Sequence, residues 1–270
     1  MSPRLFLQVL SLEARNRLSY RAEFWLNALV GFGVEFAVVY FLWSSMFRES
    51  GKQEIGGFDL QGMVTYYLAV ILLGKLVRTQ RFEGGVSTDI YEGGLNRYLV
   101  FPAGYFPFKY AQHLGGLVPA VVQFLLFALV VAFFLDVPPE LRPSPTSALM
   151  ALAAIAVANL LYYLLDYAIQ LVAFWADNVW SLDVAKWFVA SLLGGFMVPL
   201  SVFPAWLVPW LEALPFRFFF DFPARVLLGQ IEPAEWARGL VVALAWCGVL
   251  ALVGRGVWRR GVEQYAGVGI

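Results

Sequence analysis

Several kinds of residue are scarce in this chain, and each scarcity excludes a class of function. Charged residues make up 14% of the 270 positions, whereas an ordinary soluble domain has about 25%. A single cysteine, Cys247, and a single histidine, His113, provide neither an intrachain disulfide nor a zinc site of cysteine and histidine ligands. The 19 basic residues equal the 19 acidic ones, so no positive excess indicates nucleic-acid binding.

Motifs of common catalytic sites are missing as well. Of the lysines, only Lys52 and Lys75 follow a glycine. Gln53 and Leu76 come next, where a phosphate-binding loop carries serine or threonine. The zinc-protease pattern HExxH and the nucleophile pattern GxSxG do not occur either. We therefore expect no catalytic residue, no bound metal and no nucleotide hydrolysis in this chain.

Apolar residues are abundant instead, since 60% of the chain is hydrophobic and 17% is aromatic. They form six runs, each near the roughly 20 residues that a helix needs to cross a membrane. The runs are Phe24–Phe47, Leu60–Val77, Leu114–Leu135, Ser147–Trp175, Val184–Phe203 and Trp236–Trp258. We therefore expect an all-α integral membrane protein with six transmembrane helices, in a single transmembrane domain that covers residues 1–270.

The distribution of lysine and arginine predicts how the chain is oriented. If the N-terminus is cytoplasmic and the six spans alternate, most of the 19 basic residues fall on the cytoplasmic side, as the positive-inside rule requires. We therefore expect a multi-pass protein of the cell (inner, cytoplasmic) membrane, in contact with membrane lipids, with both termini in the cytoplasm.

Residues 1–23 have the pattern of an amphipathic helix. Leu5, Val9 and Leu12 recur at helical spacing. Another face carries the polar residues Arg4, Gln8, Ser11 and Arg15. A basic amphipathic helix of this kind is typical of a membrane interface, and the alternative is a solvated N-terminal helix.

Residues 199–235 are apolar but repeatedly interrupted by proline. The prolines are Pro199, Pro204, Pro209, Pro215, Pro223 and Pro233. Proline breaks helices, and broken apolar helices are tolerated at membrane depth where protein buries them or where they line a cavity. We predict short helices that re-enter the outer leaflet rather than a seventh span.

Polar residues inside the predicted spans mark candidate translocation sites, because ionisable groups are costly in a membrane. Glu35 lies midway along the first run. Asn159, Tyr163, Asp166 and Gln170 recur at helical spacing in the fourth and predict one polar stripe. The stripe either contacts a translocated solute or holds neighbouring helices together by hydrogen bonds, and both interpretations stay open.

The segment Ser87–Pro102 alternates apolar or aromatic residues with polar ones on the predicted cytoplasmic side. A short helix of this kind docks into a groove of another protein, or it lies on the lipid surface.

Two stretches carry a family resemblance: DIYEGGLNRYLVFPAGY (Asp89–Tyr105) and GGFMVPLSVFPAWLVPWLEALPF (Gly194–Phe216). YRAEF (Tyr20–Phe24) and WRRGVEQYAGVG (Trp258–Gly269) add to it. With these four stretches, nearly the whole chain resembles permease subunits of ATP-binding-cassette type-2 exporters, in the branch described as "ABC-2 family transporter protein".

The resemblance implies an architecture. Six spans would follow an N-terminal interfacial connecting helix (1–23). A cytoplasmic coupling helix (86–101) would lie between spans two and three, and a re-entrant segment (199–235) after span five. The implied ATPase-coupling residues are Asp89, Ile90, Tyr91, Gly93, Gly94, Leu95, Arg97 and Leu99, with Pro102 ending the element. The implied re-entrant gate is Pro199, Pro204, Pro215 and Phe216.

The resemblance also implies a non-catalytic permease that works as a dimer with a second copy or a homologous permease. A separate ATPase subunit would bind the ATP and magnesium. An apolar and aromatic pathway favours an amphipathic or lipid-like substrate. The alternative is an ion-coupled transporter or channel that uses Glu35 and Asp166. A third possibility is an assembly or lipid-modifying subunit without a transport path.

Overall fold

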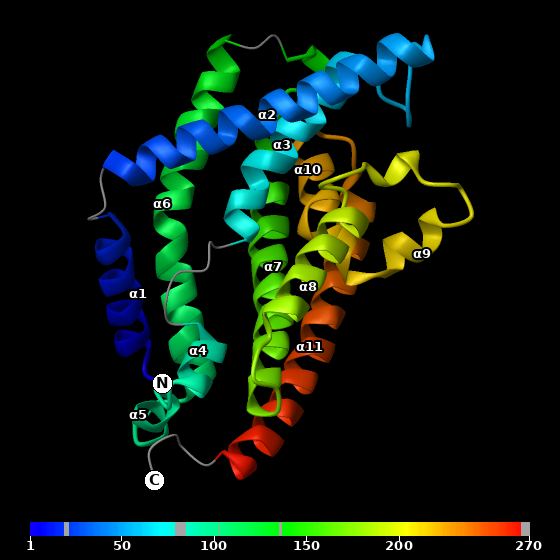
Figure 1. Ribbon diagram of the computed structural model, residues 1–270. Coiled ribbons are helices and arrows are strands. Elements are labelled where there is room, and N and C mark those ends of the chain that lie inside the picture. Colours follow the sequence, from blue (N-terminus) through cyan, green and yellow to red (C-terminus); the bar gives the residue numbers. More distant parts are fainter. Residues whose placement is uncertain (19–21, 79–84, 102, 135–136, 266–270) are drawn as a thin grey trace.

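The computed structural model describes residues 1–18, 22–78, 85–101, 103–134 and 137–265, and within these ranges it contains helices but no β-strand (Figure 1). The α-helices are α1 (Pro3–Leu18), α2 (Ala22–Ser50), α3 (Leu60–Val77), α4 (Val86–Tyr91), α5 (Leu95–Leu99), α6 (Tyr105–Phe134), α7 (Pro145–Gln170), α8 (Trp180–Leu193), α9 (Val208–Ala213), α10 (Asp221–Leu227) and α11 (Pro233–Gln264). Short 3-10 helices are η1 (Pro139–Leu141), η2 (Leu171–Phe174), η3 (Leu200–Val202) and η4 (Pro215–Phe219).

Within the described ranges, five helices are long and apolar enough to cross a membrane: α2, α3, α6, α7 extended by η2, and α11. They coincide with five of the six apolar runs, so the prediction of an all-α integral membrane protein is confirmed. Helix α3 has the predicted bounds. Helix α6 begins at Tyr105, well before the predicted Leu114, because Lys109, Gln112 and His113 interrupt the apolar run but fit a helix as readily as a loop.

The remaining run, Val184–Phe203, is the fifth in the chain and folds differently. It contains most of α8, a helix of 14 residues that is about 21 Å long at 1.5 Å per residue. That length is less than the roughly 30 Å of a membrane's hydrocarbon core. The helix stops because Gly195 has a φ of +85°, a left-handed conformation that ends helices and favours glycine. The count of six spans therefore stays a prediction.

Helix α3 lies at the centre of the bundle, and 78% of its most apolar stretch is buried. Helix α7 adds Ala151, Ala154 and Ala158 to the same core, all buried, and such small side chains let helix backbones approach closely. The segment around η4 and α10 adds the buried rings of Phe218, Phe219, Phe220 and Phe222 to the same core. The η4 and α10 segments are thus part of the core.

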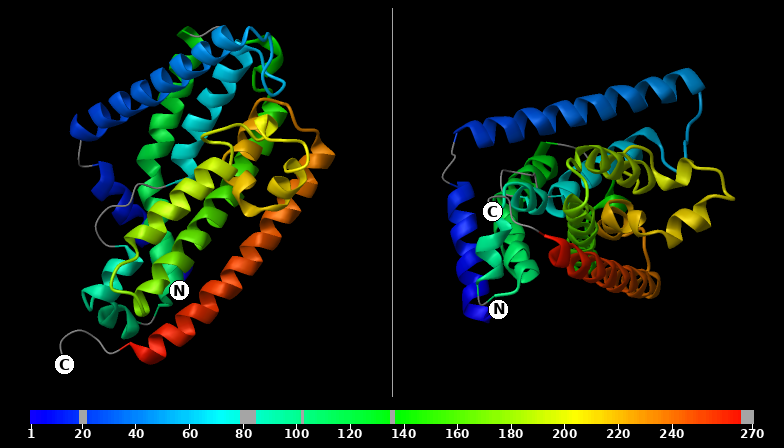
Figure 2. Two further views of the ribbon diagram at one scale, coloured as in Figure 1. Left: turned by 45° about the vertical axis from the view of Figure 1, so that its right-hand side comes forward. Right: turned by 60° about the horizontal axis from the view of Figure 1, so that its bottom comes forward.

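Helices α1 and α2 lie on the outside of this bundle. Helix α2 runs obliquely across the other long helices (Figures 1 and 2), and 0% of its most apolar stretch is buried. Helix α1 lies along α6, where a Cβ atom on Gly115 would come within 2.5 Å of the Leu10 carbonyl oxygen. Glycine at this position therefore permits the close contact. The expected interfacial location of α1 stays a prediction.

Local sequence signals begin two of the central helices at one end of the bundle. Asp59 caps α3 by accepting a hydrogen bond from the Gly62 amide at 2.8 Å. Ser144 and Ser147 form a reciprocal capping box at the start of α7, with Pro145 in its first turn. We call this end, which also holds the loop 51–59, the outer end. The opposite, inner end holds α4, α5, the start of α1 and the last turn of α11 (Figure 1).

Candidate functional site

A buried aspartate anchors the short helices at the inner end. Asp89 in α4 is 3% exposed. Its carboxylate accepts a hydrogen bond from the Tyr105 hydroxyl at 2.7 Å and pairs with the Lys109 ammonium at 2.6 Å, with Arg97 at 3.5 Å. We call these four residues the inner cluster. Because Tyr105 and Lys109 both belong to the start of α6, the cluster fixes α4 against that helix.

Apolar packing supports the inner cluster. Ile90 and Leu95 are buried together with Leu171 of η2 and Val179, which precedes α8. The segment 86–101, expected to form one helix, forms α4 and α5 with a break at Gly93, whose φ of +72° favours glycine. The break turns the chain so that both short helices place apolar side chains in the same cluster.

The residues implied in ATPase coupling fall into groups by exposure. Asp89, Ile90 and Leu95 are buried, so they hold the segment in place rather than present a surface. Tyr91, Gly93 and Gly94 are half-buried, whereas Arg97 and Leu99 are exposed. Pro102 lies outside the described residues.

Sequence reasoning missed the two most prominent side chains of this segment. Val100 is 84% exposed and Phe101 is 55% exposed, beside Leu99 at 45%. We call these three residues the inner tip. The available signal was a run of three consecutive apolar residues, Leu99 to Phe101, directly after Tyr98.

The polar stripe of α7 contacts other helices along its length. The Asn159 amide donates to the carbonyl oxygen of Leu76 at 3.0 Å, and its Oδ1 lies 3.2 Å from His113 Nε2. Asn159 therefore joins α7 to the end of α3, whose last carbonyl groups have no partner within the helix, and to α6. Tyr163 is buried against the rings of His113 and Tyr110.

The inner half of the stripe reaches two further helices. Asp166 is ion-paired with Lys186 of α8 and accepts a hydrogen bond from the Gln170 amide. Lys186 also lies 3.7 Å from Asp183. The Gln170 Oε1 atom accepts a hydrogen bond from the Ser87 backbone N–H at 3.3 Å. A continuous polar path therefore connects α8, α7 and α4.

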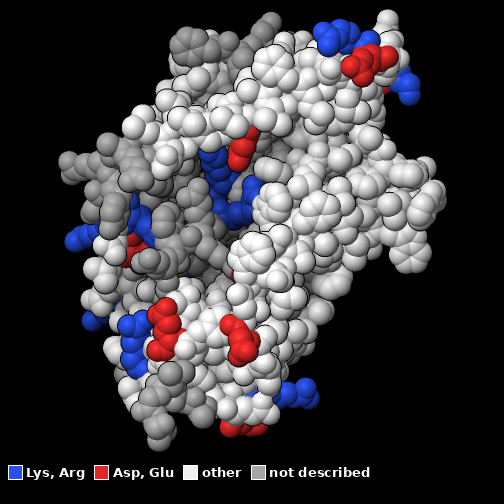
Figure 3. Space-filling view, viewed as in Figure 1, with Lys and Arg blue, Asp and Glu red and all other residues white. Residues whose placement is uncertain are grey.

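Glu35 does not join this stripe. It is exposed on α2 and interacts electrostatically with Lys75 and Arg78 at the end of α3. In Figure 3 the face beneath α2 is hollowed, and basic and acidic side chains lie inside the hollow. Sequence reasoning did not select Arg78, because a basic residue directly after a span is typical of an ordinary cytoplasmic loop.

A second buried aspartate anchors the segment after α8. Asp221 is 1% exposed and accepts hydrogen bonds from the Tyr66 hydroxyl at 3.0 Å and the Arg225 Nε at 3.1 Å. Arg217 Nε lies 3.7 Å away. We call these four residues the outer cluster. Burial disfavours the Arg225 charge, but Asp221 outweighs that effect, so the pKa of Arg225 is raised.

The four residues of the implied re-entrant gate take different places. Pro199 precedes η3 and Pro215 begins η4, and both are buried. Phe216 is half-buried beside Phe219. Pro204 is exposed at the start of the turn that leads to α9. A gating role for these residues stays a prediction.

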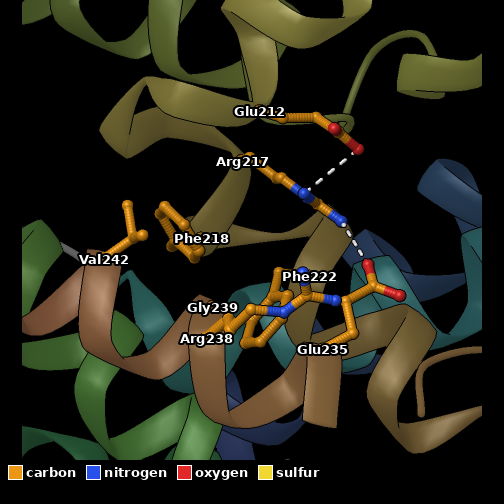
Figure 4. Close-up of a pocket in the computed structure, with 8 residues that line it drawn as sticks. All are labelled: Glu212, Arg217, Phe218, Phe222, Glu235, Arg238, Gly239 and Val242. Carbon is orange, nitrogen blue, oxygen red and sulfur yellow. Dashed lines mark hydrogen bonds and ion pairs between the residues drawn. The ribbon is translucent and has the colours of Figure 1, made fainter.

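A pocket opens between this segment and the start of α11 (Figure 4). It encloses about 290 Å³ and is lined by Glu212, Arg217, Phe218, Phe222, Glu235, Arg238, Gly239 and Val242. Arg217 pairs with Glu212 at 3.1 Å and with Glu235 at 3.4 Å, so it bridges α9 and α11. Within the described ranges, no group of three or more His, Cys, Asp or Glu residues is arranged to hold a metal ion.

Fold and site together define a multi-pass helical membrane protein with a buried, charged anchor near each end. Residues 34–269 match the family described as ABC-2 family transporter protein. The match spans most of the chain, including both stretches that carry the resemblance, so the chain belongs to this family and is a membrane component of an ATP-binding-cassette transporter. No curated protein matches the chain.

Proposed function

We propose that this chain is the permease subunit of an ATP-driven exporter and that a separate ATPase subunit docks on the inner tip. The observation that carries this proposal is the exposure of three consecutive apolar side chains, Leu99, Val100 and Phe101, on an anchored segment. Exposed apolar side chains on a firmly held support are typical of an interaction site. The ATPase supplies the ATP and magnesium, and the permease catalyses no reaction.

The contacts of α4 and α5 support a mechanical role. The inner cluster joins this segment to the start of α6, and Gln170 joins it to α7. A rigid-body movement of a docked ATPase would therefore reach two long helices directly. Such movements are a common means of switching between conformations.

The proposed topology places the inner end in the cytoplasm of the cell that carries this membrane. The start of α1 and the last turn of α11 lie at that end (Figure 1), in agreement with the bias of basic residues. A second permease, identical or homologous, completes the pathway, and the substrate is amphipathic or lipid-like.

The test is to purify the tagged chain with its ATPase subunit and to measure ATP hydrolysis. Val100→Glu and Phe101→Glu should release the ATPase, because a charge cannot be buried in an apolar contact without a large desolvation cost. Val100→Thr, which keeps the shape and adds no charge, is the matched control. Because Val100 is 84% exposed, the melting temperature of the permease should not change. Full ATPase binding by both glutamate variants would overturn the proposal.

A further inference from the structure

Three charged side chains meet between α2 and α3 without a close ion pair. Lys75 and Arg78 interact electrostatically with Glu35, yet none of the three has an ion-pair partner within 4 Å in the part of the chain that the structure describes. Unpaired charges beside membrane spans are costly and mark binding or translocation sites. Lys186 and Asp166 differ, because they neutralise each other.

Aromatic rings take the place of a counter-ion for both cations. The Lys75 ammonium lies 5.8 Å from the Phe32 ring centre and 5.5 Å from that of Phe127. The Arg78 guanidinium lies 4.3 Å from the centre of Phe196 and 5.1 Å from that of Phe220. Cation–π contacts hold a positive charge in place but leave it unneutralised.

Glu35 faces the same region from α2. Phe32 precedes it by one helical turn, which places the two on one face of the helix. Phe32 stacks on Phe127 of α6 with the ring centres 4.5 Å apart, and Lys75 lies near both rings. The face of α2 that carries Glu35 is therefore turned toward α3 and α6. Two cations and one carboxylate leave this site with a net positive charge.

An apolar cavity follows the same seam toward the outer end. It encloses about 380 Å³ between Tyr40 of α2, Val137 and the apolar α3 residues Leu60, Val64 and Leu68. Asp59, Gln61 and Thr65 form the polar part of its lining. On a helix, Leu68 and Lys75 share a face because they are seven residues apart. The charged site and the apolar cavity are therefore successive parts of one surface of α3.

We infer that the seam between α2 and α3 binds an anionic amphipath, with its headgroup at Lys75 and Arg78 and its apolar chain along Leu60, Val64 and Leu68. In the protein without ligand, the Glu35 carboxylate interacts with the Lys75 and Arg78 charges, so it competes with the headgroup for them. This inference deepens the proposed transport function, since it gives the substrate a charge and a place. It does not depend on the ATPase.

The test uses the full-length chain in neutral detergent and isothermal titration with three probes. Short-chain phosphatidylglycerol supplies an anionic headgroup, phosphatidylcholine of the same chain length supplies a neutral one, and inorganic phosphate supplies the anion alone. Phosphatidylglycerol should bind at least about tenfold more tightly than either of the others, the size expected from one added charge interaction.

The variants predict changes of opposite sign. Lys75→Gln and Arg78→Gln should weaken phosphatidylglycerol binding about tenfold, whereas Glu35→Gln should strengthen it several-fold by removing the competitor. Lys52→Gln and Arg48→Gln, exposed outer-end positions, are matched controls and should leave binding unchanged. Val64→Phe, which fills the cavity, should weaken the binding of phosphatidylglycerol but not that of inorganic phosphate. Because Glu35 is exposed, Glu35→Gln should fold normally. It therefore tests the inference even if Arg78→Gln does not fold.

Equal binding of the two lipids would overturn the inference, and so would unchanged binding in Glu35→Gln. Binding of inorganic phosphate as tight as that of phosphatidylglycerol would overturn the amphipath and leave a simple anion site. The glutamate variants of the inner tip show whether lipid binding and ATPase docking are independent of each other. Their loss of ATPase binding should leave lipid titration intact, so either result can fail without the other.

Discussion

The two buried aspartates, Asp221 in the outer cluster and Asp89 in the inner cluster, have similar partners, but these partners lie at very different distances along the sequence. Each accepts a hydrogen bond from a tyrosine hydroxyl and contacts basic side chains. The tyrosine that binds Asp221 lies 155 residues away in the central helix α3. The tyrosine that binds Asp89 lies only 16 residues away, at the start of α6.

This difference distinguishes the segment after α8, which is fixed to the core, from the inner segment, which can transmit movement to α6. The outer cluster ties η4 and α10 directly to α3 in the core of the bundle. The inner cluster joins α4 to α6, the next long helix in sequence, and the link from α4 to α7 is apolar packing plus the hydrogen bond to Gln170. The inner segment and the start of α6 therefore form a unit that is suited to move together, as the proposed ATPase coupling requires.

The comparison predicts that neutralising Asp221 costs more stability than neutralising Asp89. Asp221→Asn removes the buried carboxylate that neutralises Arg225 and Arg217, and an arginine stays charged, so the free energy of unfolding should fall by about 3–5 kcal/mol. Asp89→Asn should cost less, because the arginine beside Asp89, Arg97, is 67% exposed, whereas those beside Asp221, Arg217 and Arg225, are only 12% and 26% exposed. Thermal unfolding in detergent measures both variants, and equal losses would break the comparison.

The turn beside the outer cluster gives the next largest effect. A Cβ atom on Gly195 would lie 2.7 Å from the Tyr66 hydroxyl oxygen and 2.8 Å from Asp221 Cβ, at a φ of +85°. Gly195→Ala should therefore lower stability by about 2–3 kcal/mol, from backbone strain and the displaced hydroxyl. Gly229→Ala is the matched control, since its φ is +71° but its Cβ would meet nothing within 4 Å. A loss of the same size at both positions would mean that strain alone acts, without the cluster.

The long helices were predictable from sequence because a single physical rule governs them. A run of about 20 apolar residues is long enough to cross a membrane as one helix, and α3 has the predicted bounds. The end of α8 was not predictable in this way. Gly194 and Gly195 lie inside an apolar run that is otherwise long enough to span. The turn there depends on packing against residues far away in sequence, such as Tyr66, Phe216 and Asp221.

The candidate sites were harder to predict, because charge partners lie far apart in sequence. Asp166 was selected for its place in a span, but Lys186 is its partner. Asp89 was selected as a coupling residue, but its burial comes from Tyr105 and Lys109. Periodicity gives the face of a helix that a residue occupies. It does not give the helix that packs against that face.

The hydrogen bond between α4 and α7 predicts a smaller loss of stability. Gln170→Leu removes the acceptor of the Ser87 N–H and should cost about 1–2 kcal/mol, the penalty of a partly buried donor left unpaired. Ser87→Ala keeps the backbone donor and is the control. In the assembled transporter, Gln170→Leu should also reduce transport per ATP hydrolysed, whereas Ser87→Ala should not. Coupling that survives Gln170→Leu unchanged would remove α7 from the transmitting path.

The smallest expected effect comes from the exposed member of the inner cluster. The Arg97 side chain is 67% exposed and lies 3.5 Å from Asp89, so water screens their attraction. Arg97→Gln should change stability by less than about 0.5 kcal/mol. The same change at Arg225, 26% exposed and 3.1 Å from Asp221, should cost clearly more, and parallel thermal unfolding curves measure both.

Arg97 stands beside the inner tip, so its variant also separates stability from docking. If Arg97 contacts the ATPase, Arg97→Gln should weaken ATPase binding while the melting temperature stays the same. The reverse result, lower stability with intact ATPase binding, would show that Arg97 belongs to the anchor. In that case the inner cluster would hold its segment as firmly as the outer cluster does, and the distinction between a fixed and a transmitting segment would no longer rest on the aspartates.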